Sequence, residues 1–154
     1  MAFRLTSPTI ANGKPIPKEH ARRGDNLSPQ LEWADPPEGT HSFVLVMDDA
    51  DAPSPAFRHW IVYDIPAHHR HLPPGRSSGA GVEGLPHGFN DFGNDHYDGP
   101  EPLEGDPPHT YRFRLAALGV PKLDVGERPY AGDIWDAARE HILAEAELTG
   151  TYKT

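Results

Sequence analysis

The chain has 154 residues, the size of one ordinary domain, and residues 1–154 are treated as a single domain with its own core. It contains no cysteine, which excludes disulfides, thiolate nucleophiles and thiolate metal ligands. Its net charge of -9 opposes binding to nucleic acid and to an anionic membrane surface. The sequence shows neither an N-terminal signal segment nor a run of about 18 apolar residues, so we expect a cytoplasmic protein without stable membrane insertion.

Proline and glycine interrupt the whole chain, with 18 prolines and 15 glycines scattered without a repeat. This composition is typical of short strands joined by structured loops, and it argues against a helical bundle. Residues 3–5 and 30–33 are candidates for two short strands near the N-terminus. Residues 42–47 and 60–65 are continuous apolar runs of strand length, which indicate central strands that are buried on both faces.

A third clear strand is expected at residues 111–115, where apolar side chains alternate with arginines. Such alternation buries one face of a strand and leaves the other to solvent or to a carboxylate. Tyr111 then shares the buried face with Phe113, and with His109 if the strand begins that early.

The one good helix candidate covers residues 133–145, where apolar side chains recur at helical spacing and Asp133 is placed to act as the N-cap. We expect this helix to pack by the side that carries Trp135, Ala138 and Ile142. Residues 147–152 then predict a final strand, in which a glycine permits a bulge or close packing. Together these elements predict a mainly β domain with one main helix near the C-terminus and long Pro/Gly-rich loops.

Three carboxylates follow the apolar run at residues 42–47: Asp48, Asp49 and Asp51, with a proline-containing loop leading from them to His59. A strand end followed by a stiff loop is a typical place for functional groups. The plain alternative is that the aspartates cap turns, because Asp side chains bond their own backbone two residues on, and that His59 is structural. A further alternative is a metal-dependent hydrolase in which the three aspartates and this histidine hold a divalent cation.

A second segment holds Gly99-Pro100 and, further on, His109-Thr110-Tyr111 at the start of the predicted strand. Both segments begin with turn residues and reach a histidine beside a strand, so we expect the fold to bring them together at one pocket. No Gly-x-Ser-x-Gly elbow occurs, which argues against a serine hydrolase.

Taken together, the two segments resemble the signature of the phosphatidylethanolamine-binding protein family, and more closely its prokaryotic branch, commonly labelled Raf-kinase-inhibitor-like. The matching residues are Asp49-Ala50-Asp51-Ala52-Pro53, His59-Trp60, Asn90-Asp91-Phe92-Gly93, Tyr97-Asp98-Gly99-Pro100, Gly105 and His109-Thr110-Tyr111. They occur in order over most of the chain. The resemblance implies a β-sandwich of antiparallel sheets with a small anion-accepting pocket near one end.

The resemblance also implies which residues line or support the pocket: Asp49, Ala50, Asp51, His59, Gly99, Pro100, His109 and Tyr111. An aspartate that holds one imidazole nitrogen fixes the tautomer and raises the pKa, so two such histidines could face one phosphate with the aspartates as orienters. We expect the Gly99 N–H and the Tyr111 hydroxyl to be further donors toward the anion.

We therefore predict a binding protein for a small anionic group, such as phosphate, acetate or a phosphorylated head group, with no metal and no cofactor. The resemblance further suggests a protein partner, through regulation of the kinase- or protease-inhibitor type. Ala50 stands where the family usually has proline, and Thr110 where it usually has arginine, so this chain departs at the loop and the rim. The sequence ends at Thr154, without the C-terminal extension of eukaryotic relatives, so we expect a more open pocket or one covered by another subunit, as in a homodimer.

Overall fold

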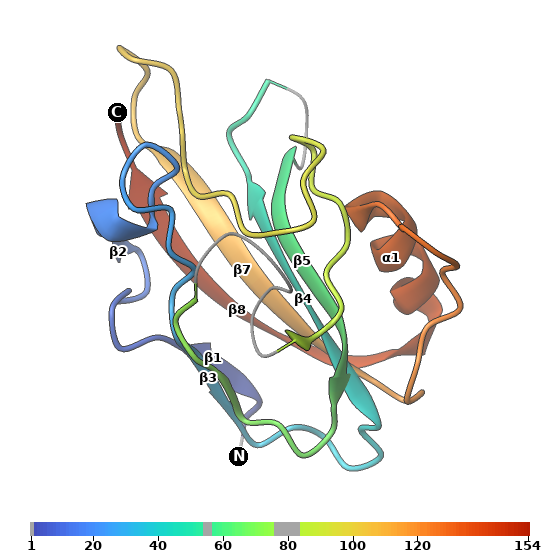
Figure 1. Ribbon diagram of the computed structural model, residues 1–154. Coiled ribbons are helices and arrows are strands. Elements are labelled where there is room, and N and C mark those ends of the chain that lie inside the picture. Colours follow the sequence, from blue (N-terminus) through green and yellow to red (C-terminus); the bar gives the residue numbers. More distant parts are fainter. Residues whose placement is uncertain (1, 54–56, 76–83) are drawn as a thin grey trace.

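The computed structural model describes residues 2–53, 57–75 and 84–154, and it forms a sandwich of two sheets (Figure 1). The larger sheet has the order β2-β8-β7-β4-β5 and the smaller has the order β1-β3-β6. The strands are β1 Arg4–Thr6, β2 Lys14–Pro15, β3 Leu31–Ala34, β4 Ser42–Asp49, β5 Phe57–Pro66, β6 His71–Leu72, β7 His109–Leu118 and β8 Ile142–Tyr152. The helices are α1 Ala131–Ala138 and two 3-10 turns, η1 Lys18–His20 and η3 Arg139–His141. The mainly β prediction with one main helix is confirmed.

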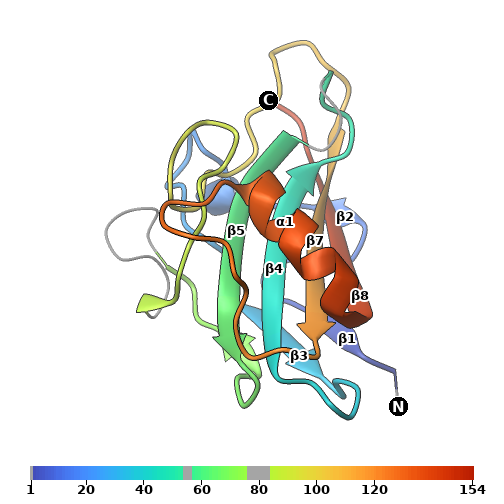
Figure 2. The ribbon, with the colours of Figure 1, turned by 90° about the vertical axis from the view of Figure 1, so that its right-hand side faces the viewer.

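The central strands are where the apolar runs predict them. Every residue of β4 is buried, because the strand lies between β5 and β7 and is covered on both faces. On one face Phe43, Leu45 and Met47 belong to the core between the two sheets. On the other face Val44 and Val46 pack under α1, which lies across the large sheet (Figure 2).

Strand β7 shows the predicted alternation and begins early, at His109. His109, Tyr111 and Phe113 are buried while the residues between them are partly exposed, so all three share the inner face. The register then determines what meets at the strand ends. Asp49, the last residue of β4, pairs with Tyr111 on one side and with Phe57, the first residue of β5, on the other.

The predicted helix at residues 133–145 is wrong at both ends. The helix begins at Ala131, its N-cap Tyr130 makes no side-chain cap, and Asp133 lies inside the first turn. Ile142 does not belong to the helix: it opens β8 and pairs with Leu118. The long ladder with β7 therefore overrides the helical spacing of the last apolar residues, although Ile142 still packs against the cluster that α1 buries.

The glycine in the last strand is explained by close packing. A Cβ atom on Gly150 would lie 2.6 Å from Ile16 Cγ1, whereas the irregularity between β7 and β8 falls between Ala117 and Leu118. Within the described part of the chain, no helix combines the length and the apolar character that a membrane crossing requires.

Candidate functional site

A pocket of about 170 Å³ opens where β4, β5 and β7 meet the loop before β7. Twelve of the described residues line it: Asp49, Ala52, Pro53, Phe57, His59, Phe92, Glu101, Pro102, Leu103, Asp106, His109 and Tyr111. Three larger hollows, of about 320, 340 and 280 Å³, are lined by neither His59 nor His109. The smaller pocket is thus the one in which both histidines of the sequence signature meet.

Four of the eight predicted site residues line this pocket, namely Asp49, His59, His109 and Tyr111. The other four lie around it. Ala50 is exposed and its N–H donates to the Thr110 carbonyl at 2.9 Å. Asp51 also holds the backbone, since its Oδ2 accepts the Thr110 N–H at 2.7 Å. Pro100 lines the neighbouring hollow of about 320 Å³.

His109 lies between two carboxylates. Its Nδ1 is 2.7 Å from Asp49 Oδ2, and its Nε2 is 3.1 Å from Asp106 Oδ2. Burial lowers the pKa of His109, but the hydrogen bonds and charges of Asp49 and then Asp106 outweigh burial, so the net shift is upward. Both ring nitrogens of the resulting imidazolium are donors, and both are engaged. Asp49 also accepts the Asp51 N–H at 2.8 Å, so it both caps a turn and orients this histidine.

His59 has a different environment, because backbone carbonyls hold it. Its Nδ1 lies 2.9 Å from the Asp98 oxygen and 3.0 Å from the Gly99 oxygen, which places the ring hydrogen on Nδ1. Burial lowers the pKa of His59, and the hydrogen bond to the Asp98 carbonyl only partly opposes it. The expectation of two cationic histidines therefore holds for His109 and not for His59. In neutral His59, Nε2 is an acceptor with no hydrogen-bond partner among the described residues.

The Tyr111 hydroxyl is buried, and both the Asp49 carboxylate and the Glu101 backbone lie close enough to influence its pKa. Neither reaches it with the distance and angle of a normal hydrogen bond, and no other described residue does. Burial, followed by the charge of Asp49, raises the pKa of this phenol, which keeps it protonated as a donor. The ring meets His59 edge to face, with centroids 5.4 Å apart. Phe57 and Phe92 continue the same wall, each in edge-to-face contact with His59.

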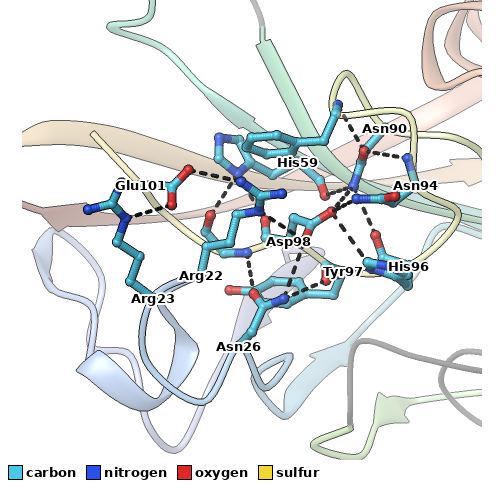
Figure 3. A network of polar contacts seen from close by, with 12 residues as sticks. Arg22, Arg23, Asn26, His59, Asn90, Asn94, His96, Tyr97, Asp98 and Glu101 are labelled. Atoms are coloured by element: carbon cyan, nitrogen blue, oxygen red, sulfur yellow. Dashed lines mark hydrogen bonds and ion pairs between the residues drawn. The ribbon is translucent and has the colours of Figure 1, made fainter. Parts of the chain in front are cut away.

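A polar network fixes the wall that carries His59 (Figure 3). Asn90 Nδ2 reaches the His59 carbonyl at 3.0 Å and Asp98 Oδ2 at 2.8 Å, and its Oδ1 accepts two backbone N–H groups. Burial raises the pKa of Asp98, but hydrogen bonds from Asn94 and then Asn90 outweigh burial and lower it overall. Asp98 therefore stays ionised at the centre of the network and holds the carbonyls that orient His59.

The predicted role of the Gly99 N–H as a donor toward an anion is wrong. This N–H donates to Asn26 Oδ1 at 2.7 Å, so the same network already uses it. The absence of a side chain at Gly99 matters for packing, because a Cβ atom there would collide with the His20 carbonyl. The glycine allows the close approach that we expect, but toward another loop of the protein.

The cluster required by the hydrolase alternative does not assemble. Asp48 and Asp49 are neighbours on a strand, so their side chains point to opposite faces of the sheet. Asp48 is fully buried on the outer face, where Arg112 Nε at 2.9 Å and Arg114 Nη2 at 2.9 Å neutralise it. Within residues 2–53, 57–75 and 84–154, no group of three acidic or histidine side chains is placed to hold a metal ion.

Several lining residues lie outside the sequence-based prediction, above all Phe57, Glu101 and Asp106. Phe57 lies two residues before His59, and the period of a strand would have placed both side chains on one face. For Asp106, the only signal is its position three residues before His109 in a loop rich in proline. Strand periodicity does not extend into such a loop.

Comparisons with known proteins show the family and the fold of the chain. Residues 6–153 match the family model described as phosphatidylethanolamine-binding protein. A UPF0098 protein of Aquifex aeolicus is 42% identical over 151 residues, which cover 98% of this chain and 88% of that protein. The crystal structure of Escherichia coli YbcL, described as a new member of the mammalian PEBP family, superposes with a TM-score of 0.91 at 33% identity and covers 100% of this chain and 99% of that one. A Chlamydia trachomatis structure, described as a putative homologue of the same family, gives 0.87 at 34% identity and covers 99% of this chain and 98% of that one.

Proposed function

The chain belongs to the phosphatidylethanolamine-binding protein family, and from this premise we propose that it binds a small oxyanion in the pocket between His59 and His109. The ligand is free phosphate or carboxylate, or the phosphorylated head group of a larger molecule. The observation that carries the proposal is the buried Tyr111 hydroxyl, which makes no hydrogen bond of normal geometry among the described residues, in the pocket that both histidines line. Buried polar groups nearly always have a partner, so this donor is suited to a bound oxygen atom.

The three polar groups have complementary roles. His109 supplies a positive charge and, when the partly exposed Asp106 side chain gives up its bond to Nε2, an N–H. Tyr111 supplies an O–H. Neutral His59 supplies an acceptor at Nε2. Two donors and one acceptor fit an oxyanion that still carries one hydroxyl, such as a monoprotonated phosphate. A carboxylate would accept hydrogen bonds from the two donors, but it has no hydrogen to donate to His59 Nε2.

We propose binding rather than catalysis as the activity. Among the described residues that line the pocket there is no serine, threonine, cysteine or lysine. Asp48, which the metal-dependent alternative needs, faces the other side of the sheet. A cytoplasmic location is part of the same proposal.

A titration followed by NMR tests the proposal. Inorganic phosphate, phosphoethanolamine and acetate are added separately at constant pH and ionic strength, and the ring resonances of His59 and His109 are recorded. Both rings should shift with one common dissociation constant, while His87, which lies outside the pocket, should not. Resonances of His59 and His109 that stay unshifted at millimolar phosphate and phosphoethanolamine would remove the basis for an anion site.

Regulation of a partner kinase or protease is a separate proposal, which the family resemblance suggests. Its test is affinity capture from lysate with the wild-type protein and with a His59→Ala variant. A partner that depends on the pocket should be captured by the wild type and lost with the variant. If instead a homodimer covers the pocket, the same variant should weaken the association of the two copies.

A further inference from the structure

The loop before β7 folds back into the pocket. Residues 101–108 connect Pro100 to the strand, and Gly105 adopts the left-handed conformation with φ +92° that turns the chain. The Asp106 N–H closes the turn by donating to the Leu103 carbonyl at 3.1 Å. The turn delivers the Asp106 carboxylate to His109 Nε2, although 38% of the Asp106 side chain remains exposed.

The charges around His109 are unbalanced. Asp49 and Asp106 share one imidazolium, which leaves one negative charge in excess. Glu101 does not add to the excess, because Arg22 and Arg23 each lie 2.9 Å from its carboxylate. An external anion beside Asp106 would meet like charge, and it would find the Nε2–H donor already in use.

Ion pairs of Glu101 and the buried Pro102 anchor the start of the loop, whereas residues 103–106 are held mainly by backbone contacts. Lys153 Nζ donates to the Asp106 carbonyl at 2.9 Å, and the Thr154 hydroxyl donates to the Pro102 carbonyl at 2.6 Å. These contacts place the loop beside the C-terminus (Figure 1). The Leu103 side chain is 72% exposed and its neighbours Glu104 and Gly105 are exposed too, so moving residues 103–106 uncovers little apolar surface. Segments with few buried contacts open at low free-energy cost.

We propose that Asp106 is an internal competitor for the anion site: its carboxylate occupies the ligand position on His109, and a ligand binds by displacing it as residues 103–106 move outward. This inference rests on the proposed function. A tethered group competes at an effective concentration of about millimolar or more, so it weakens the binding of every anion by the same factor. Asp106 therefore raises the concentration at which any anion occupies the site.

The test compares Asp106→Ala with Glu104→Ala, a matched control that removes the same charge from the same exposed loop. Sulfate and acetate are the probes, since they carry two charges and one, and binding is read from the His109 ring shifts. Competition predicts that Asp106→Ala lowers both dissociation constants by one common factor of about ten. Glu104→Ala should leave both constants within about a factor of two. In the wild type, the amide resonances of residues 103–106 should move as either anion binds.

Other outcomes contradict the inference in distinct ways. If Asp106 acts only through its charge, its removal should affect the doubly charged sulfate more than acetate, so the dissociation constant of sulfate would fall by the square of the factor seen for acetate. The same fall in Glu104→Ala would also indicate a general charge effect. Equal constants in the wild type and Asp106→Ala would overturn the competitor role and leave the proposed function intact. If neither probe, nor phosphate, shifts His109 in any variant, the proposed function itself fails. The ring shift of His109 without ligand shows in each variant whether the histidine remains folded into the site.

Discussion

The two walls of the pocket differ in how they hold a histidine. On one wall His59 is 3% exposed, held by two carbonyls and supported by the Asn90 and Asp98 network. On the other wall His109 lies between two carboxylates, one of which comes from an exposed loop. The first environment favours a neutral, fixed ring, and the second favours a cation with an exchangeable partner. The groups that accept their hydrogen bonds thus give two identical side chains different roles.

The largest effect on stability is expected at the wall that carries His59. Asn90→Ala removes a fully buried amide that reaches three acceptors and accepts two N–H groups, so several buried polar groups lose their partners. The free energy of unfolding, measured by urea denaturation, should fall by roughly 3 kcal/mol or more. Asn12→Ala, at an exposed asparagine that accepts one N–H group from Thr149, should cost about 1 kcal/mol or less. Similar losses in the two variants would show that the network does not fix this wall.

The next effect separates binding from folding. Tyr111→Phe removes a hydroxyl that makes no hydrogen bond of normal geometry among the described residues, so stability should change little. Phosphate affinity should fall about tenfold, which corresponds to about 1.4 kcal/mol. The matched control is Tyr97→Phe, because the Tyr97 hydroxyl donates to the His20 carbonyl at 2.8 Å and lies outside the pocket lining. That variant should lose stability and keep its affinity. A reversed pattern would place the anion away from Tyr111.

The two histidines should titrate in opposite directions from the ordinary pKa of 6.5, with His109 above it and His59 below it. The raised pKa of folded His109 means that its stabilising contribution is complete below the unfolded pKa and is lost as pH rises through the folded pKa. The lowered pKa of His59 has the opposite sign: its contribution is present above the unfolded pKa and is lost as pH falls through the folded pKa.

An NMR titration of both rings measures these pKa values directly. In urea denaturation at about pH 5 and about pH 8, the stability difference between the wild type and His109→Gln should be larger at the lower pH. Two rings that titrate together near the ordinary value would remove the contrast between the walls.

The smallest effect is expected at the rim. Arg23 is 78% exposed and shares Glu101 with Arg22, so Arg23→Ala should change stability by about 0.5 kcal/mol or less and leave phosphate affinity nearly unchanged. A large loss of affinity would instead place Arg23 in contact with the ligand. In that case the charge of Arg23 would offset the excess negative charge that Asp49 and Asp106 leave beside His109.

Much of the fold could be predicted because its signals are local. The apolar runs at residues 42–47 and 60–65 became β4 and β5, and the alternation after His109 became β7. The helix boundaries could not be predicted in the same way, because the pairing of Ile142 with Leu118 depends on a strand 24 residues earlier. Local helical spacing carries no information about that partner.

For the site, the sequence by itself determined which residue types meet: the order of its motifs identified the family, and strand periodicity placed His109 and Tyr111 on one face. Only the tertiary structure decided what these residues can do. It turned Asp48 to the outer face, used the Gly99 N–H inside the network and placed Asp106 on His109. The physical reason is that charge and hydrogen-bonding capacity depend on burial and on partners distant in sequence, such as the carbonyls 39 and 40 residues beyond His59.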